Sequence, residues 1–178
     1  MNLPLHLKVG NRKAEEKMNI LVLHGPNMNL IGVRASSIGE NVTLDKINTA
    51  LQREVRQKKV MLKILESYNM SKAMTFIKRN RKWADGYLIS PGAWARNGFD
   101  LLDTIQLCQI PTVEVHFSSD YDPSNFAASS IISDSCLSTE TGSPIEAYTK
   151  VLDILTAHIG LSLIHISEPT RPERSGGA

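Results

Sequence analysis

The sequence is poor in cysteine and in aromatic residues, and neither sign of charge dominates. Of its 178 residues two are Cys and 6% are aromatic, and 20 Lys and Arg stand against 18 Asp and Glu. Two cysteines without paired spacing or a histidine cluster exclude a disulfide framework and a zinc site, and they favour a reducing compartment. The small basic excess lies in residues 1–17, whereas the charges of residues 18–160 cancel. We therefore expect a cytoplasmic protein with no nucleic-acid partner.

The two ends of the chain differ in pattern from its middle. Residues 1–17 place a short apolar patch before their basic residues, which is the reverse of a signal peptide, and Met18 opens a run of strand type. We expect residues 1–17 to be an extension that is disordered or arises from the choice of start codon. Residues 161–178 begin Leu-Ser-Leu-Ile-His-Ile-Ser and resemble the conceptual translation of a transposase adapter used in DNA sequencing. They are expected to be an adapter-derived tail. For the chain as a whole, no membrane partner is expected.

Strand and helix signals alternate through residues 18–160. Apolar runs predict strands at 20–23, 60–65, 86–89 and 112–117, and apolar spacings of three and four predict helices at 44–57, 70–82, 100–109 and 145–159. Residues 32–41 have few side chains that could pack in a core and are predicted to form a mobile loop. Residues 131–132 form a short apolar segment. Strands separated by helices indicate an α/β fold, a doubly wound parallel sheet with helices on both faces. Ligands of such folds bind at the carboxyl ends of the strands.

Glu114 and His116 lie two residues apart on one of these strands. Alternation of side chains places both on the same face, where a carboxylate can orient an imidazole and stabilise its protonated form. A histidine held in this way at a strand end is suited to general acid catalysis. The alternative is a structural histidine at a strand terminus.

Asn27 and Arg34 follow the first strand. Asn27 is a polar residue at the expected ligand edge, and an arginine on a flexible lid, such as Arg34, can close on an anion. A solvated loop arginine is the alternative. Neither the dinucleotide nor the P-loop glycine pattern follows this strand. The basic residues of 78–82 lack a nucleic-acid motif and are interpreted as a solvated helix end.

Three motifs together resemble those of the type II 3-dehydroquinate dehydratases. They are HGPNMNLIGVR at 24–34, SPGA at 90–93 and EVHFS at 114–118, within a resemblance that covers residues 18–160. The resemblance implies a single flavodoxin-like domain of three α/β/α layers. It implies loss of water from 3-dehydroquinate through an enolate, in the shikimate pathway of aromatic amino acid biosynthesis, without a metal or another cofactor. It further implies a small carboxylate as substrate and a homo-oligomer of trimers assembled into a dodecamer.

The resemblance also assigns roles to individual residues. Asn27 would position a water that stabilises the enolate, and Arg34 would activate a tyrosine base on the lid. His116 would protonate the leaving hydroxyl group, with Glu114 as the residue that orients it. The remaining matches are the backbone N–H groups of Phe117 and Ser118, which would hold the substrate carboxylate, and Asp103, which would reach the site of a neighbouring subunit.

The chain departs from the family pattern at several site positions. Gly39 stands where the family has its lid tyrosine, and no tyrosine occurs in residues 24–67. Among the substrate-binding positions, Ser90 replaces an asparagine, Arg96 a histidine and Ala127 an arginine. A general base contributes about 10²–10⁴ in rate, so we expect impaired dehydration, with Arg96 holding an anion. A non-catalytic relative that binds a small carboxylate or acts as an oligomeric scaffold is the open alternative.

Overall fold

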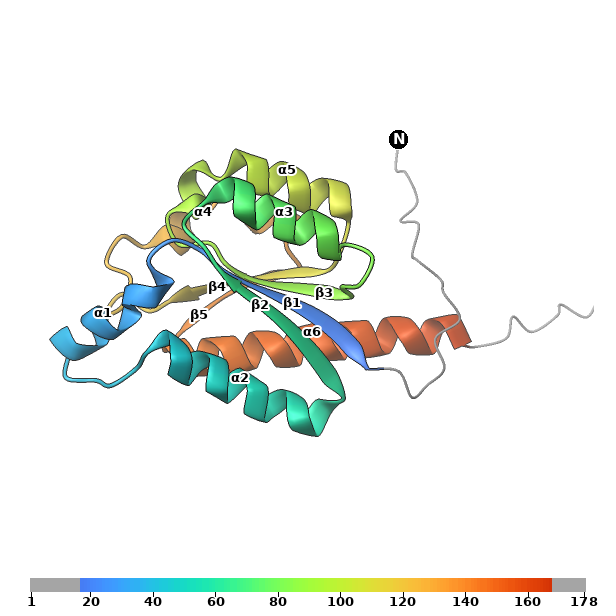
Figure 1. Ribbon diagram of the computed structural model, residues 1–178, viewed down its shortest axis with the longest axis horizontal. Coiled ribbons are helices and arrows are strands. Elements are labelled where there is room, and N and C mark those ends of the chain that lie inside the picture. Colours follow the sequence, from blue (N-terminus) through green and yellow to red (C-terminus); the bar gives the residue numbers. More distant parts are fainter. Residues whose placement is uncertain (1–16, 168–178) are drawn as a thin grey trace, which may run out of the picture.

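Five parallel strands form the sheet at the centre of the fold (Figure 1). The computed structural model describes residues 17–167. The strands are β1 (Met18–His24), β2 (Val60–Glu66), β3 (Gly86–Ser90), β4 (Thr112–Phe117) and β5 (Ser138–Gly142). The helices are α1 (Ile31–Ser37), α2 (Leu44–Lys58), α3 (Met70–Asn80), α4 (Trp94–Asn97), α5 (Phe99–Cys108) and α6 (Pro144–Ser167). The spatial order is β2-β1-β3-β4-β5, and each pairing is parallel.

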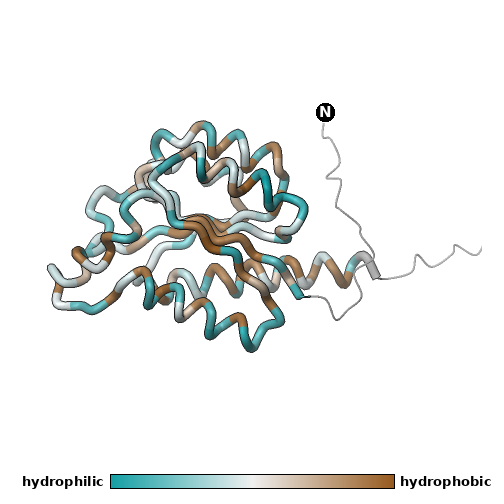
Figure 2. Tube along the Cα trace, viewed as in Figure 1, coloured by the Kyte–Doolittle hydropathy of each residue, from teal (hydrophilic) through white to brown (hydrophobic). Residues whose placement is uncertain are grey.

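Helices cover both faces of the sheet. Helices α2 and α6 pack on one face and α3 and α5 on the other (Figure 1). The apolar residues gather where the central strands pass between these helical layers (Figure 2). The predicted three-layer α/β/α domain is confirmed, and its strand order is that of the flavodoxin-like doubly wound fold.

The sheet reverses its order between β1 and β3, which places a ligand crevice at their carboxyl ends. The two strand ends are drawn together because the Gly25 N–H donates to the Ser90 carbonyl oxygen at 2.8 Å. A Cβ atom at Gly25 would collide with the carbonyl of Pro91, so only glycine permits this approach. The loops that carry Asn27 and Ser90 therefore lie against each other.

Two elements near the crevice differ from the sequence prediction. The predicted mobile loop at 32–41 is largely helical, because Ile31 and Ala35, four residues apart, bury one face of α1. Strand β5 has no predicted counterpart, since its sequence Ser-Thr-Glu-Thr-Gly lacks apolar alternation. The apolar segment at 131–132 is not a strand, and Ile132 instead packs as a buried core residue.

Helix α6 is longer than predicted and continues past Gly160 to Ser167. An isolated glycine costs a helix only about 1 kcal/mol, and Leu163 beyond it packs against the core. The adapter origin of residues 161–178 stays a prediction. The tail from residue 168 and the predicted extension up to residue 16 lie outside the described residues.

Helix α6 is also the one helix in residues 17–167 that is long and apolar enough to cross a membrane. That stretch is Pro144–His165, of which 33% is buried inside the fold. Core helices of α/β domains meet the same criterion, so the stretch is weak evidence for a membrane span.

Candidate active site

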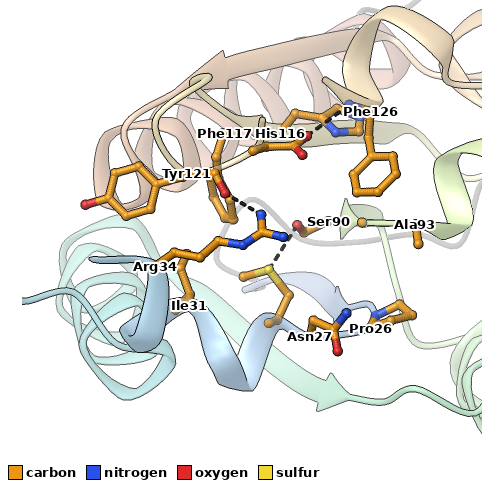
Figure 3. A pocket seen from close by; sticks show the side chains of 13 residues that line it. Pro26, Asn27, Ile31, Arg34, Ser90, Ala93, His116, Phe117, Tyr121 and Phe126 are labelled. Atoms are coloured by element: carbon orange, nitrogen blue, oxygen red, sulfur yellow. Dashed lines mark hydrogen bonds between the residues drawn. The ribbon is translucent and has the colours of Figure 1, made fainter. Parts of the chain in front are cut away.

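A cavity opens at the carboxyl ends of β1, β3 and β4 (Figure 3). The sequence candidates that line it are Asn27, Arg34, Ser90, His116 and Phe117. They come from segments far apart in the sequence, and the sheet brings them together at one edge. Within the described part of the chain, His, Cys, Asp and Glu side chains form no group of three that could hold a metal ion.

His116 is held in the cavity wall by Glu114. The His116 Nε2 atom lies 2.7 Å from Glu114 Oε1, and both residues are buried. The Glu114 carboxylate also accepts hydrogen bonds from three hydroxyl groups, those of Ser130 (2.5 Å), Ser133 (3.1 Å) and Thr139 (2.9 Å). Burial alone would raise the pKa of Glu114, but the hydrogen bonds from His116, Ser130 and Thr139 and the charge interaction with His116 together hold the pKa below its ordinary value. The Glu114 carboxylate therefore fixes the orientation of the His116 ring.

Arg34 reaches across the cavity to the segment that follows β4 (Figure 3). Its Nη1 group donates to the carbonyl oxygen of Tyr121, and the Tyr121 hydroxyl donates to the Glu40 carboxylate. Burial and the hydrogen bond to Glu40 raise the pKa of Tyr121 to about 12. Tyr121 is therefore a protonated phenol near neutral pH. The sequence did not identify Tyr121, since its position carries no periodic signal.

The expected pair of backbone N–H groups is only partly available. Phe117 lines the cavity, but the Ser118 N–H donates to the Gly142 carbonyl oxygen at 2.9 Å. The structure thus differs from the expectation for Ser118, because the end of β5 uses the N–H group that was assigned to a substrate carboxylate.

Arg96 and Asp103 lie outside the cavity lining. The Arg96 guanidinium stacks 4.9 Å from the Phe126 ring centroid and donates to Ser129 Oγ at 2.7 Å and to the Ser124 carbonyl oxygen at 2.5 Å. In this structure Arg96 donates to the chain itself and supports Phe126 as part of the cavity wall, and its expected role in holding an anion stays a prediction. Asp103 is exposed on α5, and its role toward a neighbouring subunit stays a prediction.

A buried network supports the cavity from behind. His24 Nε2 lies 2.8 Å from Asn48 Oδ1, and His24 Nδ1 lies 2.6 Å from the Tyr148 hydroxyl. Because the Asn48 oxygen only accepts, the proton of His24 lies on Nε2, and Nδ1 accepts from Tyr148. Burial lowers the pKa of His24 to about 4, against the opposing hydrogen bond to Asn48. The Ser90 hydroxyl also bonds Tyr148, so the network ends at the cavity wall.

The buried, neutral His24 predicts a loss of stability in mild acid. The unfolded chain binds a proton at His24 below pH 6.5, whereas the folded chain does so only near pH 4, so stability falls as the pH falls between these values. Between pH 7 and pH 4, the free energy of unfolding should drop by about 3 kcal/mol more in the wild type than in His24→Asn. Urea titrations at pH 7 and pH 4 measure this difference. His158→Asn, at an exposed position on α6, should keep the wild-type pH dependence, and equal slopes for all three proteins would contradict the assignment.

The fold and the cavity define an α/β protein of the flavodoxin-like class with a small-molecule site at the carboxyl edge of its sheet. The model of one family, Dehydroquinase class II, matches residues 18–156. The chain belongs to this family, and the resemblance carried by the three motifs is confirmed.

Relatives with curated names agree with this membership. The 3-dehydroquinate dehydratase of Dictyoglomus turgidum is 30% identical over 138 residues, which cover 78% of this chain and 95% of that protein. The 3-dehydroquinate dehydratase of Trichodesmium erythraeum is 36% identical over 130 residues, which cover 73% of this chain and 87% of that protein. This identity is modest, so the chain is a divergent member.

Solved structures show the same fold. The type II dehydroquinase of Butyrivibrio crossotus matches with a TM-score of 0.71 at 24% identity, over 78% of this chain and 97% of that one. A 3-dehydroquinate dehydratase-like protein from Bifidobacterium longum matches with a TM-score of 0.58 at 18% identity, over 82% of this chain and 98% of that one.

Proposed function

We propose that the protein is a hydro-lyase of the 3-dehydroquinate dehydratase type that turns over slowly. The reaction is loss of water from 3-dehydroquinate through an enolate, in the shikimate pathway of aromatic amino acid biosynthesis. The observation that carries the proposal is the buried Glu114 carboxylate 2.7 Å from His116 in the cavity wall. Family membership supports the choice of substrate.

The cavity has the groups for the acid half of this reaction. His116, held by Glu114, is the general acid that gives a proton to the departing hydroxyl. Asn27 and Ser90 lie across the cavity from His116 (Figure 3). The Asn27 amide is suited to donate to the enolate oxygen directly or through a water molecule.

The cavity lacks a good base to remove the proton next to the ketone. Gly39, at the position of the family's lid tyrosine, has a φ of 76° and no atom near the place of a Cβ. Tyr121 is the tyrosine in the cavity lining, but its pKa of about 12 and its bond to Glu40 make it a poor proton acceptor near neutral pH. We therefore propose that removal of the proton next to the ketone limits the rate.

The second candidate function is a non-catalytic protein that binds a small carboxylate or acts as an oligomeric scaffold. Two observations favour it, the glycine at position 39 and the engagement of Arg34 with the Tyr121 carbonyl. Such a protein would keep the cavity but not the proton transfers.

Two measurements with one substrate distinguish the two candidate functions. The purified protein is mixed with 3-dehydroquinate, and the absorbance of the enone product and the shift in melting temperature are recorded. Slow product formation together with a melting shift is expected. A melting shift without product would favour the binding protein, and the absence of both would refute 3-dehydroquinate as the ligand.

We further propose a cytoplasmic homo-oligomer built from trimers, up to a dodecamer, as the family resemblance implies. The exposed Asp103 on α5 is the residue expected to reach a neighbouring site. Light scattering combined with size-exclusion chromatography measures the mass in solution, and a monomer would contradict this assembly.

A further inference from the structure

One carboxylate of the cavity lining is not explained by the proposed reaction. Asp122 lies in the segment after β4, lines the cavity and is only 5% exposed. Its Oδ2 atom accepts from the Phe126 N–H at 2.9 Å, but its buried Oδ1 atom has no hydrogen-bond partner among the described residues. A buried acceptor without a partner destabilises the fold, and more so when it is charged. Such an atom at a cavity indicates a place for a donor of the ligand.

Asp122 is held rigidly by its own turn. Its backbone N–H donates to the Ser118 carbonyl oxygen at 2.9 Å, and its carbonyl oxygen accepts from the Asn125 N–H at 3.0 Å. Together with the bond from Phe126 to Oδ2, these contacts fix the orientation of the carboxylate. The Oδ1 atom is therefore a preorganised acceptor, which binds a donor without first losing side-chain freedom.

No cation of the cavity wall neutralises Asp122. Among residues 17–165, whose side chains are described, Asp122 forms no ion pair. Arg34 donates to the Tyr121 carbonyl oxygen, and His116 directs its Nε2 atom at Glu114. The cavity thus keeps an acceptor that its own donors do not reach.

Ser90 adds a second acceptor to the wall. Its hydroxyl proton is used inside the fold, toward Met28 Sδ at 3.5 Å or toward the Tyr148 oxygen. Its oxygen lone pairs are left for the cavity. An asparagine, which the family has at this position, would instead offer N–H donors. The cavity of this chain therefore favours a ligand that is rich in donors.

We propose that Asp122 is a specificity-determining residue whose Oδ1 atom accepts a hydrogen bond from a hydroxyl or ammonium group on a ring carboxylate bound in the cavity. The inference rests on the proposed ligand-binding role of the cavity and names the chemistry that the ligand must carry. Because Oδ1 is covered by its neighbours, binding requires a side chain of the cavity wall to shift.

The test compares ligands that share a ring and a carboxylate but differ in donors. Quinate carries ring hydroxyls, trans-4-aminocyclohexanecarboxylate carries an ammonium group, and cyclohexanecarboxylate carries neither. Dissociation constants are measured by calorimetry for the wild type, Asp122→Asn and the control Asp120→Asn, which removes an exposed charge two residues away. The asparagine side chain still accepts from Phe126 but turns an amide toward the ligand, so the fold is kept.

The preference for a donor-bearing ligand over cyclohexanecarboxylate should fall by about 10-fold or more in Asp122→Asn, because a hydrogen bond to a charged group is lost. It should be unchanged in Asp120→Asn. The preferred ligand, quinate or the amino acid, identifies the donor as hydroxyl or ammonium. An equal preference in Asp122→Asn and the wild type would overturn the proposal, as would failure of the wild type to bind any of the three. Turnover of 3-dehydroquinate is measured separately, so the proposed reaction and the role of Asp122 can fail independently.

Discussion

In the Gly39→Tyr background, where proton removal no longer limits the rate, replacing His116 by Gln should lower the rate of 3-dehydroquinate dehydration by about 10²–10⁴-fold, the contribution of a positioned general acid. The imidazole is the group in the cavity wall that can carry a proton to the leaving hydroxyl, and Glu114 fixes the orientation of its ring. Glutamine still donates to Glu114, so the buried carboxylate keeps a partner and the fold is retained. Steady-state absorbance assays of the enone product measure the effect on kcat.

The control for this prediction is His158→Gln. His158 is exposed on α6 and outside the cavity lining, so the same substitution there should leave kcat unchanged. Melting curves of both variants show whether the fold is intact. A Gly39→Tyr/His116→Gln protein that is folded, binds the substrate and keeps the kcat of Gly39→Tyr would refute His116 as the acid.

Introducing a base at the lid should have the opposite effect. Gly39→Tyr is expected to raise kcat by about 10²-fold or more, because a tyrosinate near Arg34 supplies the proton acceptor that the chain lacks. Open space surrounds position 39, so the ring is not excluded by clashes. The positive φ of 76° costs a non-glycine residue about 1–2 kcal/mol of stability, which the fold should tolerate.

Gly39→Phe is the matched control, since it has the same ring and the same backbone strain but no hydroxyl. It should melt like Gly39→Tyr and show wild-type kcat. Equal rates for the two variants would mean that the base is supplied elsewhere. In that case the missing tyrosine does not limit the reaction.

Much of the fold was predictable because the strongest signals lie in the layers that bury the most surface. The runs that became β1, β2, β3 and β4 are apolar, and the spacing of Ile47, Leu51 and Val55 matches the buried face of α2. Strand β5 was not predictable, since its polar residues are ordered by pairing with β4 rather than by burial. Helix α1 was missed because a single buried pair, Ile31 and Ala35, is too short a pattern to detect.

The site was predictable where local geometry decides it. Strand alternation correctly placed Glu114 beside His116, and the reversal of strand order accounts for Asn27 and Ser90 at one edge. The hydroxyls around Glu114 were not predictable, because Ser130 and Thr139 lie 16 and 25 residues away in segments without periodicity. The contacts of Arg96 were likewise not predictable, because its Nε and Nη2 groups donate to Ser129 and Ser124, about thirty residues away in a segment without periodicity.

The polar composition of β5 has a consequence for the behaviour of the protein at high concentration. This strand forms one margin of the sheet, where unpaired backbone groups are a template for strands of other molecules. Its Ser, Thr and Glu side chains, with Glu140 paired to Lys150 at 2.5 Å, make that margin hydrophilic and charged. The protein should therefore resist strand-to-strand aggregation at this margin, and a Glu140→Val variant should precipitate at lower concentration than the wild type.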